Sequence, residues 1–545
     1  MKKIINAVIL LILGLILCCF YYPVINYGFL GFPFLLIVLI VIWLFLNLHL
    51  SLDKMMQGQQ KLFLPTKPSK IPFIILGALI IYCTIIPIAT TWALFRSSDY
   101  RNLIGKVEVG DSLSRHMAPI SIDKIRVVDQ SLAQLLGDKV LGSQPALGSQ
   151  VVLGTFTIQK VRDQLYWVAP LLHSGFFKWQ QNQEGTNGYV MVNATNERDV
   201  KLVQEVHGQK VHIKYQSEAF FMDNLERYVY MHGHWNVGLT DYTFEIDDDG
   251  NPYWVITKFK KTIGFDGDDA TGVVIVNAGT GEIKDYTIAN TPAWVDRVQP
   301  AEFIQNQLND WGKYVKGFIN FSNDNKLQIT EEVSLVYGED NKAYWYTGLT
   351  SVGSDESTVG FVLVNTRTKQ STWYRQSGAT EVAAQNSAIG KVQEKGYTSS
   401  LPIPYNINNI PTYVMTLKDR SGLVKMFAMV AIEDYTIVGV GNTLRETLMS
   451  YKNAYNMAGN RINTKSKTTR TAIKSVITRI NGDIKNGNTY YYFTLRSNPK
   501  IFIGSSQISN QLPITTVGDS VEVSFDNDNQ DIIDVSSFKN KNINR

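Results

Sequence analysis

The sequence predicts a membrane-anchored, multidomain α+β protein. It has N-terminal transmembrane helices, antiparallel-sheet repeat modules with packed helices, and a C-terminal small β-barrel. Three observations predict this fold class: long apolar segments confined to residues 1–99, a strand motif that recurs three times, and short strand patterns without helices in residues 471–545. The chain has 545 residues, of which 45% are hydrophobic. That content is enough for several cores and excludes a largely disordered chain.

Three apolar segments near the N-terminus are each long enough to cross a bilayer. We place them at about residues 4–22, 29–48 and 71–95, and no Asp, Glu, Lys or Arg occurs from residue 4 to residue 52. A transmembrane helix needs about 20 apolar residues. The alternatives are a buried helix of a soluble protein and, for the first segment, a cleaved signal peptide. We keep the first segment as an anchor because its last residues, Leu-Cys-Cys-Phe-Tyr-Tyr, lack the small side chains that cleavage requires.

The basic residues predict how these segments are oriented. Lys2 and Lys3 precede the first span and four lysines lie between the second and third, whereas the turn between the first two carries no charge. Positively charged loops stay in the cytoplasm. We therefore expect a cytoplasmic N-terminus, the lipid bilayer of the plasma or inner cell membrane as a partner, and residues 100–545 outside the cytoplasm.

Cysteine usage agrees with this orientation. The three cysteines, Cys18, Cys19 and Cys83, all lie inside the predicted spans. An exported segment without thiols has nothing to oxidise, although a cytosolic domain can also lack cysteine. Three cysteines in a chain of this length exclude a disulfide scaffold.

The net charge of +4 belongs to the anchor and not to a ligand-binding surface. Residues 1–99 hold seven basic and two acidic residues, and the rest of the chain holds 45 basic and 46 acidic residues. The predicted exported part is nearly neutral, so we expect no nucleic-acid partner. The inverted topology, with the barrel as a cytoplasmic nucleic-acid module, is an alternative that protease digestion of intact spheroplasts would test.

A repeated motif predicts antiparallel hairpins in the middle of the chain. Tyr-Trp followed by a strand of the form Gly-x-Val-x-Val-Asn occurs within residues 166–193, 253–277 and 344–365. The Trp-to-Gly spacing falls from 21 to 18 to 15 residues, as hairpin loops of different length allow. We expect each asparagine to open a turn and helices to cover one face of each sheet. The tryptophans that recur at the motif position are expected in the cores: Trp167, Trp254 and Trp345.

The second and third copies resemble the PepSY-type module, a small exported α+β domain. Residues 274–283, Val-Ile-Val-Asn-Ala-Gly-Thr-Gly-Glu-Ile, are similar to that family's apolar strand, turn and Thr-Gly-Glu signature. The third copy departs from it, since residues 365–369 lack the Gly-Glu pair, and the first copy departs further. The resemblance covers about residues 240–400. It implies exported binding or regulatory modules and supplies no catalytic residue.

The last part of the chain resembles a small barrel of the OB-fold or SH3-like kind. Its composition predicts about five short strands, and fold analogy alone assigns them no ligand. The predicted strands are residues 473–480, 489–495, 500–504, 520–525 and 532–538. The predicted parts of the chain are the anchor (1–99), an entry module with the first hairpin (100–240), the second repeat module (241–325), the third repeat module with a helix (326–458), a linker (459–470) and the barrel (471–545).

Histidines and acidic turns are the candidate ligand groups. His232 and His234 are one residue apart, which on a strand would place both imidazoles on one face, and His207 and His212 are near in sequence. The alternative is a set of hydrogen-bonded or solvated histidines around Trp235, which we favour because no Cys and no His-Glu-x-x-His helix accompanies them. We predict no metal ion or other cofactor.

Two acidic clusters, residues 247–250 and 266–269, carry oxygen ligands of the kind that calcium binds. Each stands where a hairpin must turn, and Asp and Gly are turn-forming residues. We favour turns over surface calcium sites.

No catalytic motif stands out in the sequence. There is no Gly-x-Ser-x-Gly elbow, phosphate-binding loop or dinucleotide fingerprint. The candidates for contact surfaces are the tryptophans outside the motif: Trp179, Trp235, Trp294 and Trp373.

These observations predict a non-enzymatic cell-envelope protein. The expected function is to present a large extracytoplasmic region that binds or scaffolds an envelope protein or a cell-surface polymer, as part of a larger assembly. The alternative is an envelope hydrolase or peptidase regulator with its site between modules, which clustered carboxylates of perturbed pKa would favour. The sequence gives no oligomeric state.

Overall fold

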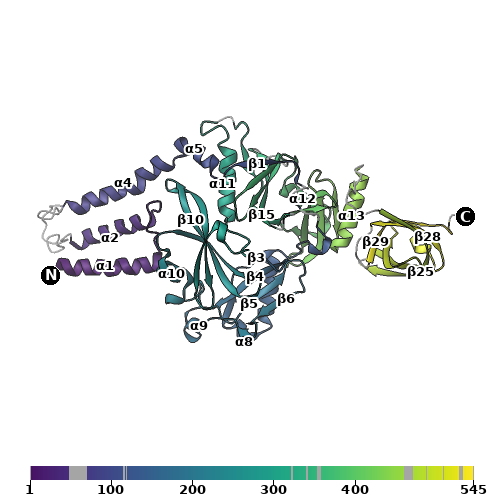
Figure 1. The fold of residues 1–545 in the computed structure, drawn as a ribbon, viewed down its shortest axis with the longest axis horizontal. Coiled ribbons are helices and arrows are strands. Elements are labelled where there is room, and N and C mark those ends of the chain that lie inside the picture. The colour runs from purple at the N-terminus through teal and green to yellow at the C-terminus, as the bar shows by residue number, and fades with distance from the viewer. Residues whose placement is uncertain are drawn as a thin grey trace.

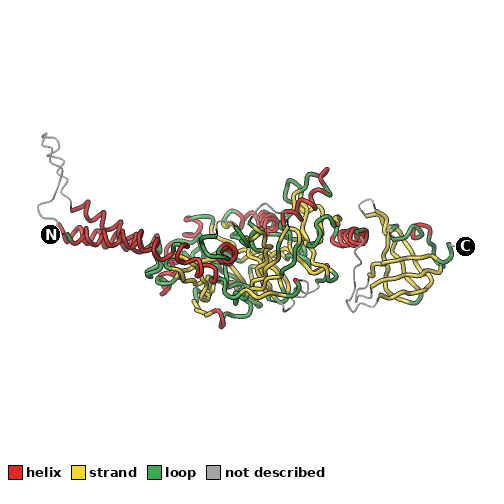
Figure 2. Tube along the Cα trace, turned by 90° about the horizontal axis from the view of Figure 1, so that it is seen from above, coloured by secondary structure: helices red, strands yellow, loops and turns green. Residues whose placement is uncertain are grey.

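The computed structural model shows an elongated mixed α+β molecule with antiparallel sheets, as the sequence predicts. Apolar helices lie at one end, a body of helices and sheets in the middle and a small all-β part at the other end (Figures 1 and 2). The residues that the structure describes are 2–47, 70–113, 117, 120–320, 323–338, 340, 342–352, 357–458, 470–485, 488–506, 508–526 and 532–543. The predicted linker at 459–470 lies outside them except for its last residue.

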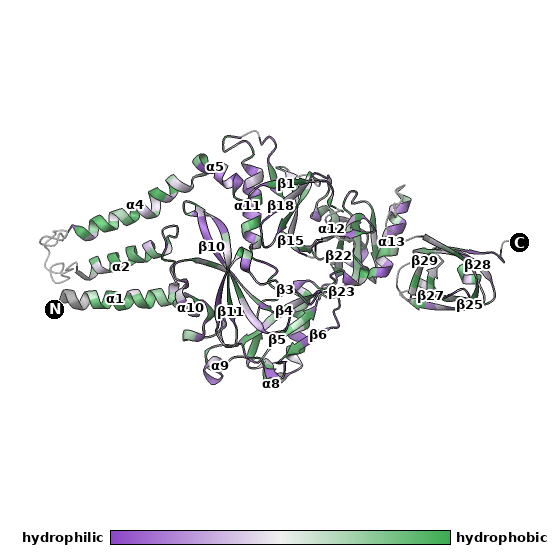
Figure 3. Cartoon of the chain, viewed as in Figure 1, coloured by the Kyte–Doolittle hydropathy of each residue, from purple (hydrophilic) through white to green (hydrophobic). Residues whose placement is uncertain are grey.

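Three apolar helices, α1 (Lys2–Tyr21), α2 (Gly31–Asn47) and α4 (Ile71–Thr91), lie side by side (Figure 3). Among the described residues, only α4 has both the length and the hydropathy to cross a membrane by itself. The other two contain shorter apolar stretches, at Ala7–Tyr21 and Gly31–Phe45. The described residues of α4 include none that is buried. The helix therefore presents its apolar side chains to the surroundings instead of to a protein core.

The third predicted span is too long at its C-terminal end. The helix α4 ends at Thr91, where Trp92 adopts an extended conformation, and α5 (Ala93–Asn102) begins as a separate helix. The physical reason is a change of composition, because α5 carries Arg96 and Asp99, which form an ion pair 3.1 Å apart. Residues 93–95, which the prediction placed in the span, are the first turn of this polar helix.

The body consists of four units, each built on one antiparallel hairpin. The first sheet has the strand order β2-β4-β5-β6 and the second β12-β11-β10-β9. The elements of the first unit are α7 (Gln130–Gly142), α8 (Pro145–Gly148), β2 (Val151–Leu153), β3 (Thr157–Val161), β4 (Gln164–His173), α9 (Phe176–Gln181), β5 (Tyr189–Asn193) and β6 (Val200–Val203). A small hairpin, β7 (Glu205–Val206) and β8 (Gln209–Lys210), and the 3-10 turn η2 (Phe221–Asp223) lead into the second unit. Its elements are α10 (Leu225–Val229), the π-helical turn η3 (Tyr230–His234), β9 (Gly238–Ile246), β10 (Pro252–Ile263), β11 (Asp266–Asn277), β12 (Ile283–Thr287) and η4 (Ile288–Asn290).

The third and fourth units continue the same plan. The third sheet has the order β1-β18-β17-β15-β13, in which β1 pairs in parallel with β18, and the fourth has the order β20-β22-β23-β24. The third unit comprises α11 (Ala301–Lys313), β13 (Leu327–Ile329), β14 (Ser334–Tyr337), β15 (Ala343–Ser351), β16 (Ser357–Thr358), β17 (Gly360–Asn365) and β18 (Ser371–Tyr374), with β1 (Val107–Gly110) from an earlier segment, whereas η1 (Ile122–Lys124) packs on the fourth unit. The fourth comprises β19 (Gly378–Ala379), α12 (Glu381–Gly390), η5 (Gln393–Lys395), β20 (Thr398–Ser399), β21 (Ile403–Ile407), β22 (Ile410–Lys418), β23 (Val424–Ala431), β24 (Val438–Gly441) and α13 (Leu444–Met457).

The motif tryptophans are buried, as predicted, and make equivalent hydrogen bonds. Each is 6–7% exposed, and each donates its indole N–H to a backbone oxygen of the segment that enters its own unit. The bonds are Trp167 Nε1 to Val128 O (2.8 Å), Trp254 Nε1 to Tyr215 O (2.7 Å) and Trp345 Nε1 to Gln299 O (2.9 Å). The motif thus closes each unit by tying its entry segment to its central hairpin.

The motif asparagines open turns, also as predicted. The side-chain oxygen of each accepts from backbone N–H groups two or three residues further on: Asn193 from Thr195, Asn277 from Gly279 and Thr280, and Asn365 from Arg367 and Thr368. The carbonyl that follows each asparagine accepts from two successive amides of the entry segment. These carbonyls belong to Ala194, Ala278 and Thr366.

The fourth unit repeats this arrangement without the sequence motif. Tyr413 stands where the other units have tryptophan, and its hydroxyl donates to Ala379 O at 3.3 Å. The amide of Ala379 in turn donates to Ile432 O at 2.7 Å. Ala431 stands at the position of the motif asparagine, and the turn is opened three residues later by Asp434, which accepts from the Thr436 amide at 2.9 Å. The single module predicted at residues 326–458 therefore covers two sheets.

Residues 470–543 form a separate all-β part. Its strands are β25 (Arg470–Lys485), β26 (Asn488–Leu495), β27 (Asn498–Ser505), β28 (Ser520–Asp526) and β29 (Ile532–Asn540), with the turn η6 (Leu512–Ile514). The pairings run in a closed cycle, β25-β26-β27-β29-β28, in which only β27 and β29 are parallel. Phe493, Phe502 and Phe525 fill its interior and are at most 1% exposed.

Candidate functional site

Two carboxylates, one buried and one half-buried, lie where the first three units meet. Glu245, on β9 of the second unit, is 1% exposed. Asp296 lies in the segment that leads into α11 of the third unit, and its Oδ2 accepts from the backbone amide of Lys160 on β3 (2.8 Å) and from the hydroxyl of Tyr337 on β14 (3.0 Å). Arg297 follows in the chain and places an Nη atom 3.3 Å from Glu245 Oε1. We call these four side chains, Glu245, Asp296, Arg297 and Tyr337, the junction cluster.

Burial perturbs the protonation of the junction cluster. It raises the pKa of Glu245 to about 7, although the Arg297 guanidinium favours the ionised form. It also raises the pKa of Asp296, against the opposing hydrogen bonds from Lys160 and Tyr337. Among the described residues, Glu245 Oε2 has no hydrogen-bond partner. A proton on that oxygen would reduce the cost of burying it.

The junction cluster contains the groups that acid–base catalysis uses, but it lies at a contact between three units. Two carboxyls with raised pKa beside an arginine are a common feature of active sites, but buried ion-pair networks perturb pKa values as well. Glu245 is almost fully shielded from solvent, so a substrate does not reach it in this conformation. What the geometry provides is a charged, hydrogen-bonded contact between three units.

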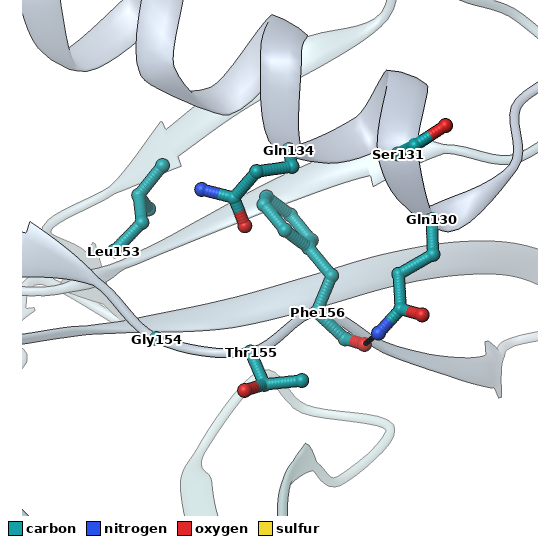
Figure 4. Close-up of a pocket in the computed structure, with 7 residues that line it drawn as sticks. All are labelled: Gln130, Ser131, Gln134, Leu153, Gly154, Thr155 and Phe156. Atoms are coloured by element: carbon teal, nitrogen blue, oxygen red, sulfur yellow. Dashed lines mark hydrogen bonds between the residues drawn. The ribbon is translucent and has the colours of Figure 1, made fainter.

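A shallow pocket of about 360 Å³ opens elsewhere, beside α7 of the first unit (Figure 4). Gln130, Ser131 and Gln134 of the helix face the segment after β2, where Gln130 Nε2 donates to Phe156 O at 2.9 Å. The pocket is lined by Gln130, Ser131, Gln134, Leu153, Gly154, Thr155 and Phe156. It offers amide and hydroxyl groups over an apolar floor and no titratable side chain. It can therefore form hydrogen bonds but not transfer protons at neutral pH.

The predicted histidine pair does not lie on a strand. His232 and His234 belong to η3, in which Gly233 has φ 104°. The same-face argument therefore fails, because it requires extended backbone. His234 is 8% exposed and contacts Asp285 Oδ2 through Nε2 at 2.9 Å, while His232 Nδ1 lies 2.7 Å from Tyr228 O. Among the described residues, no three His, Cys, Asp or Glu side chains gather as metal ligands would.

The first acidic cluster forms a turn, as we favoured, but the second does not. Residues 266–269 begin β11, because the hairpin turns just before them at Gly264, which has φ 62°, and Phe265. Asp247 accepts from the amides of Asp249 and Asn251 at 3.0 and 2.8 Å. In the second cluster, Asp268 lies 2.6 Å from Lys261 Nζ, and Asp269 lies 2.5 Å from Lys369 Nζ. The carboxylates that could have held calcium are thus engaged by backbone amides or by lysines.

The four tryptophans outside the motif differ in exposure. Trp179 is 7% exposed and Trp235 is 44% exposed. Trp294 and Trp373 are half-buried: Trp294 packs on Tyr253 with ring centroids 5.2 Å apart, and Trp373 packs on Trp311 at 5.5 Å. Of the four, only Trp235 presents a large fraction of its indole to the surroundings.

The described residues also form a bonded contact between the apolar helices and the body. In the connection between α1 and α2, Ile25 N donates to Trp235 O at 2.9 Å, and Pro23 O accepts from the Tyr230 hydroxyl at 2.9 Å. At the end of α4, Thr91 O accepts from the hydroxyl of Tyr100 at 3.0 Å. Sequence reasoning missed this contact because its bonds go to backbone atoms, which no side-chain pattern marks.

Comparisons with known proteins add no functional assignment. The chain matches no family model and no curated protein.

Proposed function

We propose that this chain is an integral membrane protein of the cell envelope, with its N-terminus in the cytoplasm and residues 100–545 outside it. The exported region would serve as a non-enzymatic binding or scaffolding surface for an envelope protein or a cell-surface polymer. In this proposal α1, α2 and α4 all cross the bilayer, the hairpin units are PepSY-like and the C-terminal strands form an OB-like barrel.

One observation carries the proposal: the body is bonded to the ends of apolar helices whose sides face outward. The hydrogen bonds of Ile25, Tyr230 and Tyr100 place the body directly against the ends of α1 and α4. Exposed apolar residues run along these helices, including Leu11 (66%) and Ile74 (67%). The exposure of such apolar surface to water is unfavourable in free energy, whereas its contact with the hydrocarbon core of a bilayer is favourable. The body would then stand at the membrane surface in a fixed orientation.

The orientation is tested by cysteine labelling in cells. The three native cysteines are first replaced by alanine, and single cysteines are then introduced as Ser421→Cys in the β22–β23 turn and Ser51→Cys between the second and third predicted spans. A membrane-impermeant maleimide is expected to label residue 421 on intact spheroplasts and residue 51 only after permeabilisation. The reverse pattern would show that the body lies in the cytoplasm and would overturn the proposal.

The hydrolase alternative keeps one supporting observation, the two junction carboxyls of raised pKa. It would require the units to separate and expose Glu245. A purified full-length protein that degrades envelope polymer or peptide, with activity lost in Glu245→Gln and retained in the exposed control Glu205→Gln, would favour the alternative over a scaffold. Equal activity of the two variants would exclude Glu245 from the chemistry.

A further inference from the structure

An uncovered group of apolar side chains lies on the body beside the end of α1. It comes from α9 and η2, which are far apart in sequence. Its exposed fractions run from 38% for Phe176 and Phe220 to 74% for Phe177. We call this group the aromatic patch: Phe176, Phe177, Phe220, Phe221 and Met222. Contiguous exposed apolar surface of this kind marks a contact site.

The rings of the aromatic patch are held in place. Phe176 contacts Phe177, Phe220 and Trp179 with centroids 5.1–5.7 Å apart. Trp179 lies beneath them and is fixed by donating its indole N–H to Asp223 Oδ2 at 3.1 Å. Because the rings are ordered before any contact forms, little conformational entropy is lost when the patch binds.

Backbone geometry also favours a functional role for the patch. Phe221 has φ 52°, in the left-handed region that bulky residues seldom adopt, and it is 61% exposed. Such a conformation is strained for a residue that carries a β-carbon. A strained and exposed phenylalanine does not stabilise the folded body. Its side chain therefore has a role in a contact that the body itself does not provide.

The η2 end of the patch is linked to the last turn of α1. The Arg227 guanidinium joins the two, because Nε donates to Cys19 O at 3.2 Å and one Nη donates to Phe221 O at 3.0 Å. The same guanidinium stands over the Phe20 ring, 5.5 Å from its centroid. In Figure 1, α10, which carries Arg227, lies directly at the end of α1, and α9 lies on the same side of the body.

We propose that the aromatic patch inserts into the boundary between headgroups and acyl chains of the bilayer that α1 crosses. The proposal rests on the membrane anchoring proposed above. If the last turn of α1 reaches that boundary, Arg227 holds Phe221 at the same depth. Aromatic side chains are favoured at this depth, where an apolar surface meets a polar one.

The link to the helix favours lipid over a protein partner. Phe20, 72% exposed in the last turn of α1, is joined to the patch through Arg227, which stands over its ring and donates to Phe221 O. On the side of the body, the patch is backed by Asp223 and Lys214, an ion pair 3.8 Å apart. A surface that is tied to the end of an outward-facing apolar helix and is polar behind suits a membrane interface better than a separate docking site.

Depth-dependent quenching in nanodiscs tests the proposal with the full chain. In a background in which all three native cysteines are alanine, a single cysteine at Phe177→Cys or Phe221→Cys carries an environment-sensitive nitrobenzoxadiazole label. The nanodiscs contain phosphatidylcholine and phosphatidylglycerol, with or without lipid spin-labelled near the headgroup. We expect blue-shifted emission and loss of most of it to the spin-labelled lipid at both positions. The same label at Ser421→Cys should show neither.

Two further measurements separate the outcomes. A label on the native Cys83 of α4, with the other two cysteines replaced by alanine and with the lipid spin-labelled on its acyl chain, reports on the anchor itself, because Cys83 lies near the middle of the helix. Quenching at Cys83 without quenching at 177 or 221 would overturn the patch proposal and leave the anchor standing, whereas no quenching at any position would overturn both. Energy transfer between differently labelled copies at 177, without lipid quenching, would show that a second copy of the chain covers the patch. It would overturn the proposal that the bilayer does.

A variant without the apolar side chain guards against trivial misfolding. Phe221→Asn removes the ring while asparagine tolerates the left-handed backbone. With this substitution, the label at 177 should lose part of its quenching while the melting temperature in detergent does not fall. Unchanged quenching would argue that Phe221 does not enter the lipid.

Discussion

Glu245 is the buried carboxyl of the junction cluster, 1% exposed and paired with Arg297. It carries no repeated pattern, unlike the motif tryptophans, whose repetition at one spacing indicates a common structural position. In its strand, polar Thr243 and Glu245 alternate with apolar Phe244. This ordinary pattern places Glu245 on the polar face, and nothing in it marks the side chain as buried. Its role depends on Arg297 and on units that are distant in sequence. A single sequence does not show which distant residues meet.

Glu245 is expected to make stability depend on pH near neutrality. Burial raises its pKa from the ordinary 4.5 to about 7. Since the folded state binds this proton more tightly, its contribution to stability is complete below about pH 4.5 and is lost as the pH rises through about 7. The loss amounts to at most about 3 kcal/mol. Glu245→Gln, which mimics the protonated form, should therefore melt at a temperature that falls less between pH 5 and pH 8 than that of the wild type.

The matched control for this prediction is Glu205→Gln, an exposed glutamate on β7. Other carboxyls with raised pKa, such as Asp310 at about 6, titrate in all three proteins and cancel in the comparison. Parallel melting curves against pH for wild type and Glu245→Gln would contradict the assignment of this titration to Glu245.

The hairpins show how far a sequence motif can define structural elements. Three hairpins were predicted from Tyr-Trp and Gly-x-Val-x-Val-Asn, and all three form, with registers such as Trp254 opposite Val276. The fourth was missed because Thr-Tyr replaces Tyr-Trp while the backbone bonds persist. The segment of His232 was mistaken for a strand because its pattern is short, and Gly233 with φ 104° allows a π-helical turn instead.

The three indole hydrogen bonds are equivalent, so we expect the removal of each to lower the free energy of unfolding by a similar amount. Trp167→Phe, Trp254→Phe and Trp345→Phe each delete one indole donor and leave a backbone carbonyl without it. An unsatisfied buried acceptor costs about 1–3 kcal/mol, and the smaller ring adds a packing loss. We expect all three variants to lower the melting temperature, whereas Trp235→Phe, at an exposed position, should not. A loss in only one of the three would argue against a common role for the bond.

The units of the body share their interiors, and the C-terminal strands do not. One core contains Trp167 of the first unit and Trp345 of the third, and another joins Tyr346 of the third to Tyr413 of the fourth. The core of residues 470–543 draws only on its own strands. The five predicted strands of this part lie within the observed ones, because short alternating patterns bounded by turn residues are local signals. The packing of units against one another depends on distant contacts, which no local pattern reveals.

This difference predicts two unfolding transitions for the full chain in detergent. The four units should unfold together because they share cores, and residues 470–543 should unfold separately because their described core cluster contains no residue of the units. In calorimetry, Phe502→Ala should lower the melting temperature of the transition of residues 470–543, by the equivalent of about 3–5 kcal/mol for a buried phenylalanine. Tyr413→Phe should lower only the melting temperature of the transition of the four units. A fragment of residues 470–545 should reproduce the first transition alone, and a single transition that both substitutions shift would show that the two parts fold as one.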